Sequence, residues 1–372
     1  MKVAFVSPEP TPYRAPLLDR VAAHPDVELT TVYAARTVAS RAWSVELHHP
    51  AVFLGGVNIP GVRRIVRHDY PLTPGVFGAL GDAHPDVVVV SGWSTFAAQG
   101  ALGWCRARRV PYVLLVESHD AGPKAGWRRR VKETTVPPIV RGAGGVLVVG
   151  SLAHASVVAL GADPSRIRVF ANTIDVAAYG ARADALLARR PALRATLGLA
   201  EQEVAVISVA RLVSEKGLDT LLRAAASADV RAVVVGSGPA RSRLEMLGSE
   251  AIFTGELSGE RVAEAYAAAD VFALLSTHEP WGVAVNEAAA SGLPLVLSDL
   301  VGAAADLLRD GENGVLVPSG DTTAAADAFR RLRDPELRRA YGARSRELVA
   351  GWGYEPSVDA LVETCREAIA AR

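Results

Sequence analysis

The sequence predicts an α/β protein with two doubly wound parallel sheets. Short apolar runs rich in Val, Ile and Leu alternate with stretches of helical length and pattern, an order typical of βαβ units. The runs are apolar on both faces, as strands covered by helices on both sides must be. The length of 372 residues favours two domains, because one domain commonly holds about 100–200 residues.

The first half of the chain shows this alternation less regularly than the second. We expect strands at 3–7, 28–33, 87–90, 112–116, 146–149 and 168–170, and helices at 16–23, 96–108, 127–141 and 152–160. Residues 36–75 show no clear pattern and hold several glycines and prolines, so no element is predicted there.

The second half is regular. We expect strands at 204–209, 232–235, 252–254, 271–275, 295–297 and 315–317, and helices at 218–226, 239–247, 260–268, 282–290, 304–309 and 323–333. Residues 176–200 hold an Ala- and Arg-rich helical stretch and are interpreted as the linker between domains at 1–175 and 201–354. A last helix within 355–372 follows aromatic residues beside a glycine, which suits a chain crossing a hinge.

Composition excludes several classes of protein. Lys and Arg together number 40 and so do Asp and Glu, and this zero net charge disfavours non-specific nucleic-acid binding. The two cysteines, Cys105 and Cys365, are far apart and lie in no metal-binding motif, which favours free thiols in a reducing cytosol. The first apolar run is too short for a signal peptide, and the uncharged stretch 143–162 divides better into a strand, a turn and a helix than into a membrane span. A cytoplasmic protein is expected.

Ligands of doubly wound sheets bind at the carboxyl ends of the strands, so the residues that follow each strand are the candidates. Arg211 and Lys216 share the loop after the strand at 204–209, where two cations could neutralise a pyrophosphate. The alternative is an exposed loop with two solvated charges, or Lys216 paired with Glu215.

The segment after the strand at 271–275 holds two acids around a predicted helix start. Free backbone amides at 282–284 would form an anion site, aided by the helix dipole. Glu287 lies one turn beyond Val283, about 6 Å further along the axis, roughly the step from a pyrophosphate to its ribose. Glu279 would lie where a sugar on the second phosphate sits. The alternative is a helix N-terminus that only favours acidic residues, with Glu287 on a solvated face of the helix.

The run from Glu279 to Glu287 resembles the E-x7-E motif of the family 4 retaining glycosyltransferases. The surroundings are similar too, namely Asn286–Pro294, Asp299, Gly302, Asp310–Val317, Ala210–Leu212, Lys216–Gly217 and Gly236–Pro239. The resemblance is strong over about 204–320 and weaker over 1–175. It implies the GT-B fold, in which two Rossmann-like domains face each other across a cleft and the last helix returns to the first domain.

The resemblance also implies roles for single residues. Arg211 and Lys216 would hold the donor pyrophosphate and Glu287 the ribose. Glu279 would contact the transferred sugar, with the backbone of the adjoining helix start. His119, directly after the strand at 112–116, would reach the donor sugar from the first domain. The complete set expected at the catalytic and donor site is His119, Arg211, Lys216, Gly236, Leu257, Glu279, Trp281, Gly282, Val283, Ala284 and Glu287.

The loop after the first strand departs from the family, since its run Ser7–Arg14 has three prolines and no glycine. Tyr13 and Arg14 could face the acceptor, and core packing or a salt bridge explains them equally well. The basic cluster Lys124–Lys132 could touch an anionic membrane or form a solvated helix face.

The expected activity is that of a retaining glycosyltransferase, of hexosyltransferase type, moving a sugar from a nucleotide-diphosphate donor to a hydroxyl of a saccharide, lipid-linked or small-molecule acceptor. The resemblance implies front-face displacement. Gly236-Ser237-Gly238 lacks the third glycine of a dinucleotide fingerprint and no Asp-x-Asp occurs, so neither a cofactor nor a metal is expected. The alternatives are another GT-B enzyme, such as a nucleotide-sugar epimerase, or a non-catalytic nucleotide-sugar-binding subunit.

Overall fold

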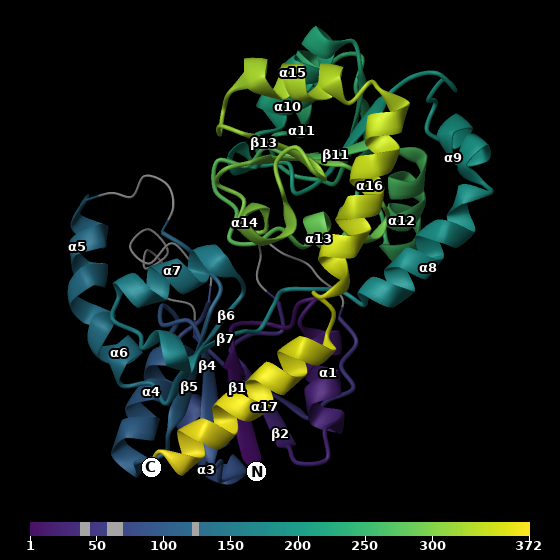
Figure 1. Cartoon of the computed structure of the whole chain (residues 1–372). Coiled ribbons are helices and arrows are strands. Elements are labelled where there is room, and N and C mark those ends of the chain that lie inside the picture. The colour runs from purple at the N-terminus through teal and green to yellow at the C-terminus, as the bar shows by residue number, and fades with distance from the viewer. Residues whose placement is uncertain (38–44, 58–69, 121–125) are drawn as a thin grey trace.

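The computed structural model describes residues 1–37, 45–57, 70–120 and 126–372, without the side chains of 126–129. Two parallel sheets with helices on both faces form two lobes, the N-terminal lobe below and the C-terminal lobe above in Figure 1. The expected α/β architecture with two parallel sheets is confirmed.

The sheet of the N-terminal lobe has seven strands in the order β3-β2-β1-β4-β5-β6-β7, and every neighbouring pair is parallel. The strands are β1 (Lys2–Ser7), β2 (Glu28–Tyr33), β3 (Ala51–Phe53), β4 (Val87–Ser91), β5 (Tyr112–Val116), β6 (Gly145–Val148) and β7 (Ile167–Val169). The helices of this half are α1 (Ala15–Ala23), α3 (Val76–Ala83), α4 (Phe96–Arg108), α5 (Gly126–Thr135), α6 (Pro137–Arg141) and α7 (Ser151–Ala159), with a 3-10 turn η1 (Pro164–Arg166).

The sheet of the C-terminal lobe has six parallel strands in the order β10-β9-β8-β11-β12-β13. The strands are β8 (Ala205–Val209), β9 (Arg231–Val235), β10 (Ile252–Gly255), β11 (Val271–Leu274), β12 (Leu295–Ser298) and β13 (Gly314–Val317). The remaining elements are η2 (Ser214–Lys216), α8 (Val176–Leu187), α9 (Arg190–Thr196), α10 (Leu218–Ala228), α11 (Arg241–Leu247), α12 (Gly259–Ala268), α13 (Val283–Ala290), α14 (Ala304–Leu307), α15 (Thr322–Arg331), α16 (Pro335–Ala350) and α17 (Glu355–Ala370).

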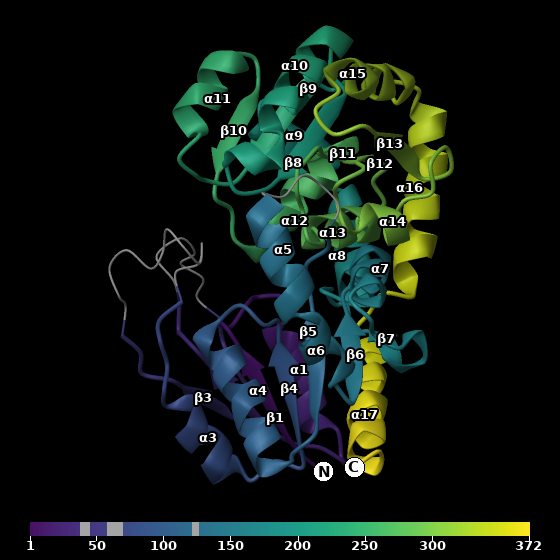
Figure 2. The ribbon, with the colours of Figure 1, turned by 90° about the vertical axis from the view of Figure 1, so that its left-hand side faces the viewer.

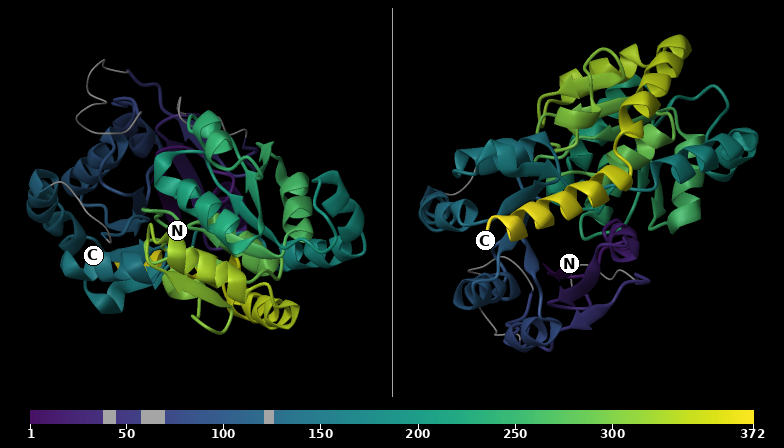
Figure 3. Two further views of the ribbon diagram at one scale, coloured as in Figure 1. Left: turned by 90° about the horizontal axis from the view of Figure 1, so that it is seen from above. Right: turned by 60° about the horizontal axis from the view of Figure 1, so that its bottom comes forward.

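The last helix, α17, lies on the N-terminal lobe. Figures 1 and 2 show it running along the seven-stranded sheet, with the C-terminus near the N-terminus of the chain. Its Leu361, Cys365 and Ala368 are buried in one cluster with Phe5 of β1 and Val89 of β4. The chain therefore crosses between the lobes twice, and the right-hand view of Figure 3 shows α17 leaving the C-terminal lobe to lie along the other.

The segment that the sequence analysis interpreted as a linker is helical and joins the C-terminal lobe. Leu186 of α8 and Leu193 of α9 pack with Ala263 and Ala267 of α12. Asp270, just before β11, fixes this packing with carboxylate bonds to Arg190 and Arg194, at 2.8 and 3.0 Å.

Several elements differ from the sequence-based expectation. A strand and a helix, β3 and the start of α3, come within or directly after the stretch that showed no pattern. The helix expected at 127–141 ends at Thr135 and restarts at Pro137, because proline cannot continue the hydrogen-bond ladder of the preceding turn. The 16-residue helix α16 was not predicted, and the helix expected at 304–309 spans only Ala304–Leu307.

Candidate functional site

Both sheets reverse their strand order at one point, between β1 and β4 in one lobe and between β8 and β11 in the other. A crevice forms at such a point because the connections on its two sides run to opposite faces of the sheet. The segments after β1, β5, β7, β8 and β11 line one cleft of about 590 Å³ between the lobes. Its lining residues are Tyr13, Glu117, Ser118 and Asn172 from the N-terminal lobe, and Val209, Ala210, Arg211, Glu215, Lys216, Leu274, His278, Glu279, Pro280, Trp281, Gly282, Val283 and Ala284 from the C-terminal lobe.

Lys216 and Glu279 form an ion pair inside this cleft. Lys216 ends the turn η2 after β8, and Glu279 lies in the loop between β11 and α13. The Lys216 ammonium donates to Oε2 of Glu279, and each side chain is 13% exposed. The alternative pairing of Lys216 with Glu215 is therefore wrong for this structure. Arg211 lines the same cleft and is exposed, and its side chain makes no hydrogen bond or ion pair with another residue of the described part.

Helix α13 begins at the cleft. Gly282 has a φ of 98°, which favours glycine, and a Cβ added there would lie 3.0 Å from the Leu274 side chain, which would be a tight contact. Gly282, Val283 and Ala284 line the cleft. The first amides of a helix have no partner within it, which makes this end suited to an anion.

Glu287 lies one turn into α13, behind the cleft-lining residues. Its Oε2 accepts a hydrogen bond of 3.0 Å from the hydroxyl of Tyr266 on α12. Burial raises the pKa of Glu287 to about 7, and the hydrogen bond from Tyr266 opposes that shift. Sequence reasoning missed Tyr266. Its signal was a lone phenol in an Ala-rich helix, since a buried hydroxyl needs a partner.

Trp281 is one of the residues that line the cleft, and its indole is packed inside the protein. The side chain is 2% exposed, donates from Nε1 to Asn286 Oδ1 at 2.9 Å, and stacks on Trp352 with centroids 5.0 Å apart. Asn286 bonds Thr173 at 3.3 Å, and Thr173 donates to the carbonyl of Trp352. The loop that carries Glu279 is thereby connected to both segments in which the chain crosses between lobes.

His119 bridges the lobes directly. Its Nε2 lies 2.9 Å from the backbone carbonyl of Glu279, and its ring is 5.2 Å from that of His278. Backbone carbonyls only accept, so Nε2 carries the proton in this contact. The structure places His119 beside the predicted sugar-contacting acid, and its role toward a donor sugar stays a prediction.

Arg14 is buried, with 4% of its surface exposed, and its charge is engaged within the protein. It pairs with Glu117 at 2.7 Å, donates to Asn172, and lies 4.5 Å from the centre of the Phe170 ring. The salt bridge that the sequence left open is thus formed. Tyr13 lines the cleft beside Glu117.

Gly236 and Leu257 belong to the expected donor site, which includes the place of the nucleotide base, and they lie after β9 and β10. Gly236 has a φ of 136°, and a side chain there would collide with the carbonyl of Ala210. Leu257 is half-buried and packs with the same core cluster as Ala210 and Ala284. Neither residue lines the cleft, and their contact with a base stays a prediction.

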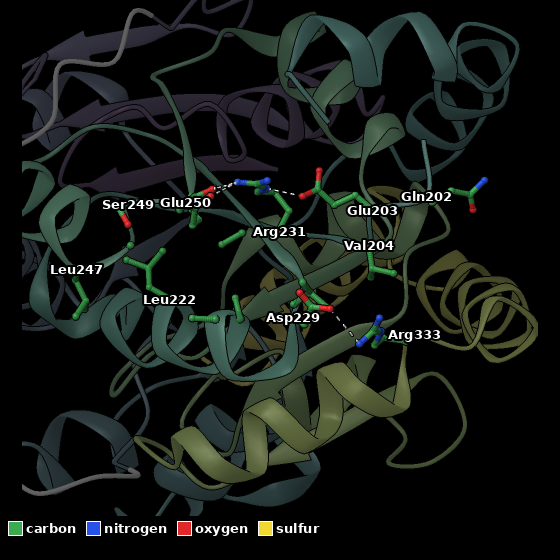
Figure 4. Close-up of a pocket in the computed structure, with 16 residues that line it drawn as sticks. Gln202, Glu203, Val204, Leu222, Asp229, Arg231, Leu247, Ser249, Glu250 and Arg333 are labelled. Carbon is green, nitrogen blue, oxygen red and sulfur yellow. Dashed lines mark hydrogen bonds and ion pairs between the residues drawn. The ribbon is translucent and has the colours of Figure 1, made fainter. Parts of the chain in front are cut away.

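A second pocket, of about 420 Å³, lies at the amino ends of β8 and β9, opposite the cleft (Figure 4). Arg231 pairs there with Glu203 at 2.6 Å and with Glu250 at 3.3 Å. Arg333 pairs with Asp229 at 3.6 Å. These charges satisfy one another, so we place the candidate site in the cleft.

The basic cluster Lys124–Lys132 is only partly described. Lys124 lies outside the described residues, as do the side chains of Trp127, Arg128 and Arg129. Lys132 pairs with Asp120 at 2.5 Å, and Arg130 is exposed. Within the described residues, no helix combines the length and apolar character of a membrane span, and no group of three or more His, Cys, Asp or Glu side chains could hold a metal ion.

Comparison of the sequence with known proteins identifies the family of the chain. The description "Glycosyl transferases group 1" matches residues 189–348, and "Glycosyl transferase 4-like domain" matches residues 15–173. The chain is 31% identical to a D-inositol 3-phosphate glycosyltransferase of Thermomonospora curvata over 91% of this chain and 88% of that protein. It is 41% identical to a GDP-mannose-dependent α-mannosyltransferase of Mycobacterium tuberculosis over 39% of this chain. That match spans only 38% of the relative, and the match to a D-inositol 3-phosphate glycosyltransferase of Rhodococcus opacus spans 49%.

Solved structures agree on the fold. A sucrose-phosphate synthase of Thermosynechococcus elongatus superposes over 100% of both chains with a TM-score of 0.77 at 20% identity. HepE of Anabaena, in complex with UDP and glucose, covers 98% of this chain and 99% of its own with a TM-score of 0.72 at 19% identity. The molecule is thus of the GT-B class, with two Rossmann-like lobes facing each other across the cleft, as expected. The chain belongs to the family 4, group 1 glycosyl transferases.

Proposed function

We propose that this protein transfers a sugar from a nucleoside-diphosphate donor to an acceptor hydroxyl with retention of the anomeric configuration. The carrying observation is the Lys216–Glu279 pair at the start of α13, inside a cleft that both lobes line. One cation and one carboxylate within reach of the same helix N-terminus offer partners for a diphosphate and for its sugar.

The donor diphosphate would lie at the start of α13. Its two phosphates carry negative charge, which Lys216, Arg211 and the free amides at 282–284 would stabilise together. Arg211 has no competing partner among the described residues, so its guanidinium is available to a phosphate. Two cations would neutralise the leaving diphosphate without a metal. Unchanged turnover in EDTA supports that part of the proposal. A loss of turnover in EDTA that added Mg²⁺ restores contradicts it.

Catalysis would rest on positioning and on charge stabilisation. The bond from the anomeric carbon to the phosphate oxygen breaks while the acceptor oxygen bonds that carbon from the same face. The acceptor proton passes to the departing phosphate oxygen. Glu279 would hold the sugar hydroxyls, and His119 would fix the Glu279 loop from the opposite lobe.

We propose that the lobe formed by residues 1–175 binds the acceptor and that 201–354 binds the donor. The helical segment 176–200 joins the two and packs on the donor lobe. On the acceptor side, Arg14 has its charge engaged and would act through Glu117, whose side chain is 37% exposed and lines the cleft. Tyr13 would contact the acceptor beside it. Peripheral membrane contact through the basic cluster is a further proposal, supported by the exposed Val131 on α5.

The test is a thermal-shift and calorimetry panel of UDP, GDP, dTDP and ADP on the full chain. Stabilisation by one nucleoside diphosphate, lost in Arg211→Ala, supports the donor site and identifies its base. A ligand at about 100 times its Kd adds about 2.7 kcal/mol, which moves the midpoint by degrees. NMR of the glycoside formed from the matching donor then gives the anomeric configuration of the transferred sugar. An inverted product, or no response to any diphosphate, contradicts the proposal.

A further inference from the structure

We propose that Tyr266 is the positioning residue of the donor site: its hydroxyl holds one oxygen of Glu287 so that the other stays available to the ribose hydroxyls of the nucleotide. The inference rests on the proposed function, because it needs Glu287 to meet a ribose. It assigns a role to a residue on α12, a helix that contributes nothing to the lining of the cleft.

The geometry of the contact carries the proposal. The Tyr266 side chain is fully buried, and its hydroxyl lies 3.0 Å from Oε2 of Glu287 and 3.4 Å from the carbonyl of Ala284. A phenol has one proton to donate, and the nearer, charged acceptor is the stronger partner. Oε1 of Glu287 makes no hydrogen bond with another residue in the described part of the chain. A carboxylate tied at one oxygen presents the other in a fixed direction.

The surroundings keep Tyr266 a donor. Its ring meets Tyr179 of α8 edge-on, with centroids 6.5 Å apart. Burial and the nearby Glu287 raise the pKa of both phenols, so both remain protonated when Glu287 is ionised. Arg182 is the cation acting on Tyr179, and it opposes the rise of that pKa.

Among the described residues, the other neighbours of α13 bring no competing charge to Glu287. On α16, Arg346 pairs with Asp184 at 2.7 Å. On α14, Asp306 is bonded by Ser151. Strands β11 and β12 hold no titratable side chain. Tyr266 is therefore the main group in the described part of the chain that opposes protonation of Glu287.

A pH dependence follows. Glu287 accepts ribose hydroxyls best when ionised, and its pKa near 7 means that nucleotide affinity falls as pH drops through 7. Loss of the Tyr266 hydroxyl removes a contact that lowers this pKa, so the midpoint moves to higher pH. A purely structural role would weaken binding at every pH alike.

The experiment compares UDP and GDP with their 2′,3′-dideoxy forms by calorimetry on the full chain between pH 5.5 and 8.5. In Tyr266→Phe, the affinity ratio of ribose to dideoxy forms should fall about tenfold at pH 7, and the midpoint should rise. Tyr341→Phe is the matched control, since Tyr341 is also buried and also loses one hydroxyl contact, to Arg331. It should leave the ratio unchanged.

A second variant keeps the test decisive if Tyr266→Phe fails to fold. 3-Fluorotyrosine at position 266 keeps the shape and donates more strongly, so the midpoint should move to lower pH. An unchanged midpoint there, or equal losses for ribose and dideoxy forms in Tyr266→Phe, overturns the inference. If Glu287→Gln also leaves the ratio unchanged, or no diphosphate binds at all, the proposed ribose site itself is wrong. If Glu287 matters and Tyr266 does not, only this inference fails.

Discussion

Glu279→Gln should make the protein bind a free nucleoside diphosphate more tightly while turnover falls. In the unliganded cleft Lys216 already has an anionic partner, so a diphosphate must compete with Glu279 for the ammonium. The amide keeps the size of the side chain and removes the charge. Lys216 is then released to the phosphates, and the repulsion between Glu279 and the diphosphate disappears.

The size of the effect follows from the contact. Two unit charges about 4 Å apart attract by about 4 kcal/mol at an effective dielectric constant of about 20. Each side chain is 13% exposed, and desolvation offsets much of that attraction, leaving a net coupling of about 1–2 kcal/mol. Diphosphate affinity should therefore rise about fivefold to thirtyfold. Turnover should drop by about a hundredfold or more, because the sugar loses its carboxylate contact.

The assay is calorimetric titration of UDP and GDP into the wild type and Glu279→Gln, at low and high salt. Glu215→Gln is the matched control, since Glu215 lines the same cleft and its carboxylate is exposed and not paired with Lys216. The gain in diphosphate affinity of Glu279→Gln over the wild type should be smaller at high salt, because screening weakens the competition between Glu279 and the diphosphate for Lys216. Weaker diphosphate binding in Glu279→Gln, or a gain no larger than in Glu215→Gln, would refute the reasoning.

Three further outcomes are expected. Asp270→Ala leaves the buried Arg194 and the partly exposed Arg190 without their carboxylate. It should cost about 3–5 kcal/mol of unfolding free energy in urea, against less than about 0.5 for the surface control Asp327→Ala. The pKa of Glu287 rises on folding from 4.5 to about 7, so the folded state holds this proton more tightly. Stability of the unliganded protein should fall by up to about 3 kcal/mol as pH rises through that range, and Glu287→Gln should flatten the slope of Tm against pH. Gly282→Ala should weaken diphosphate binding about tenfold or more in a titration, because a Cβ there meets Leu274, whereas Gly311→Ala, equally left-handed but in open space, should not.

Much of the fold could be predicted because apolar β-branched runs and helical periods are local signals. Strand β3 escaped notice because three residues at a sheet edge carry no periodicity. Helix α16 was not predicted because charged residues interrupt its apolar pattern. The two prolines at 137 and 138 are the sequence signal for the break between α5 and α6.

The candidate site was predicted as a set of loops rather than as contacts. The spacing of Glu279 and Glu287 can be read from the sequence, but their partners cannot. Lys216, the partner of Glu279, is 63 residues away, and Tyr266, the partner of Glu287, is 21 residues away, each on another element. Trp281 was expected at the donor site through its backbone, and no direction was predicted for its indole, which contacts a crossing segment that only the assembled lobes bring near. Side-chain direction depends on packing between elements, which a local pattern does not contain.

The return of α17 to the first sheet has a consequence for synthesis on the ribosome. The buried surface of β1 and β4 is covered by Leu361 and Cys365, which are translated more than 250 residues later. The C-terminal lobe, whose strands run without interruption from β8 to β13, can close its own sheet as it emerges. The lobe that is synthesised first is thus completed last. Until residues 355–370 are synthesised, its apolar face stays exposed, where chaperones can bind and aggregation can begin.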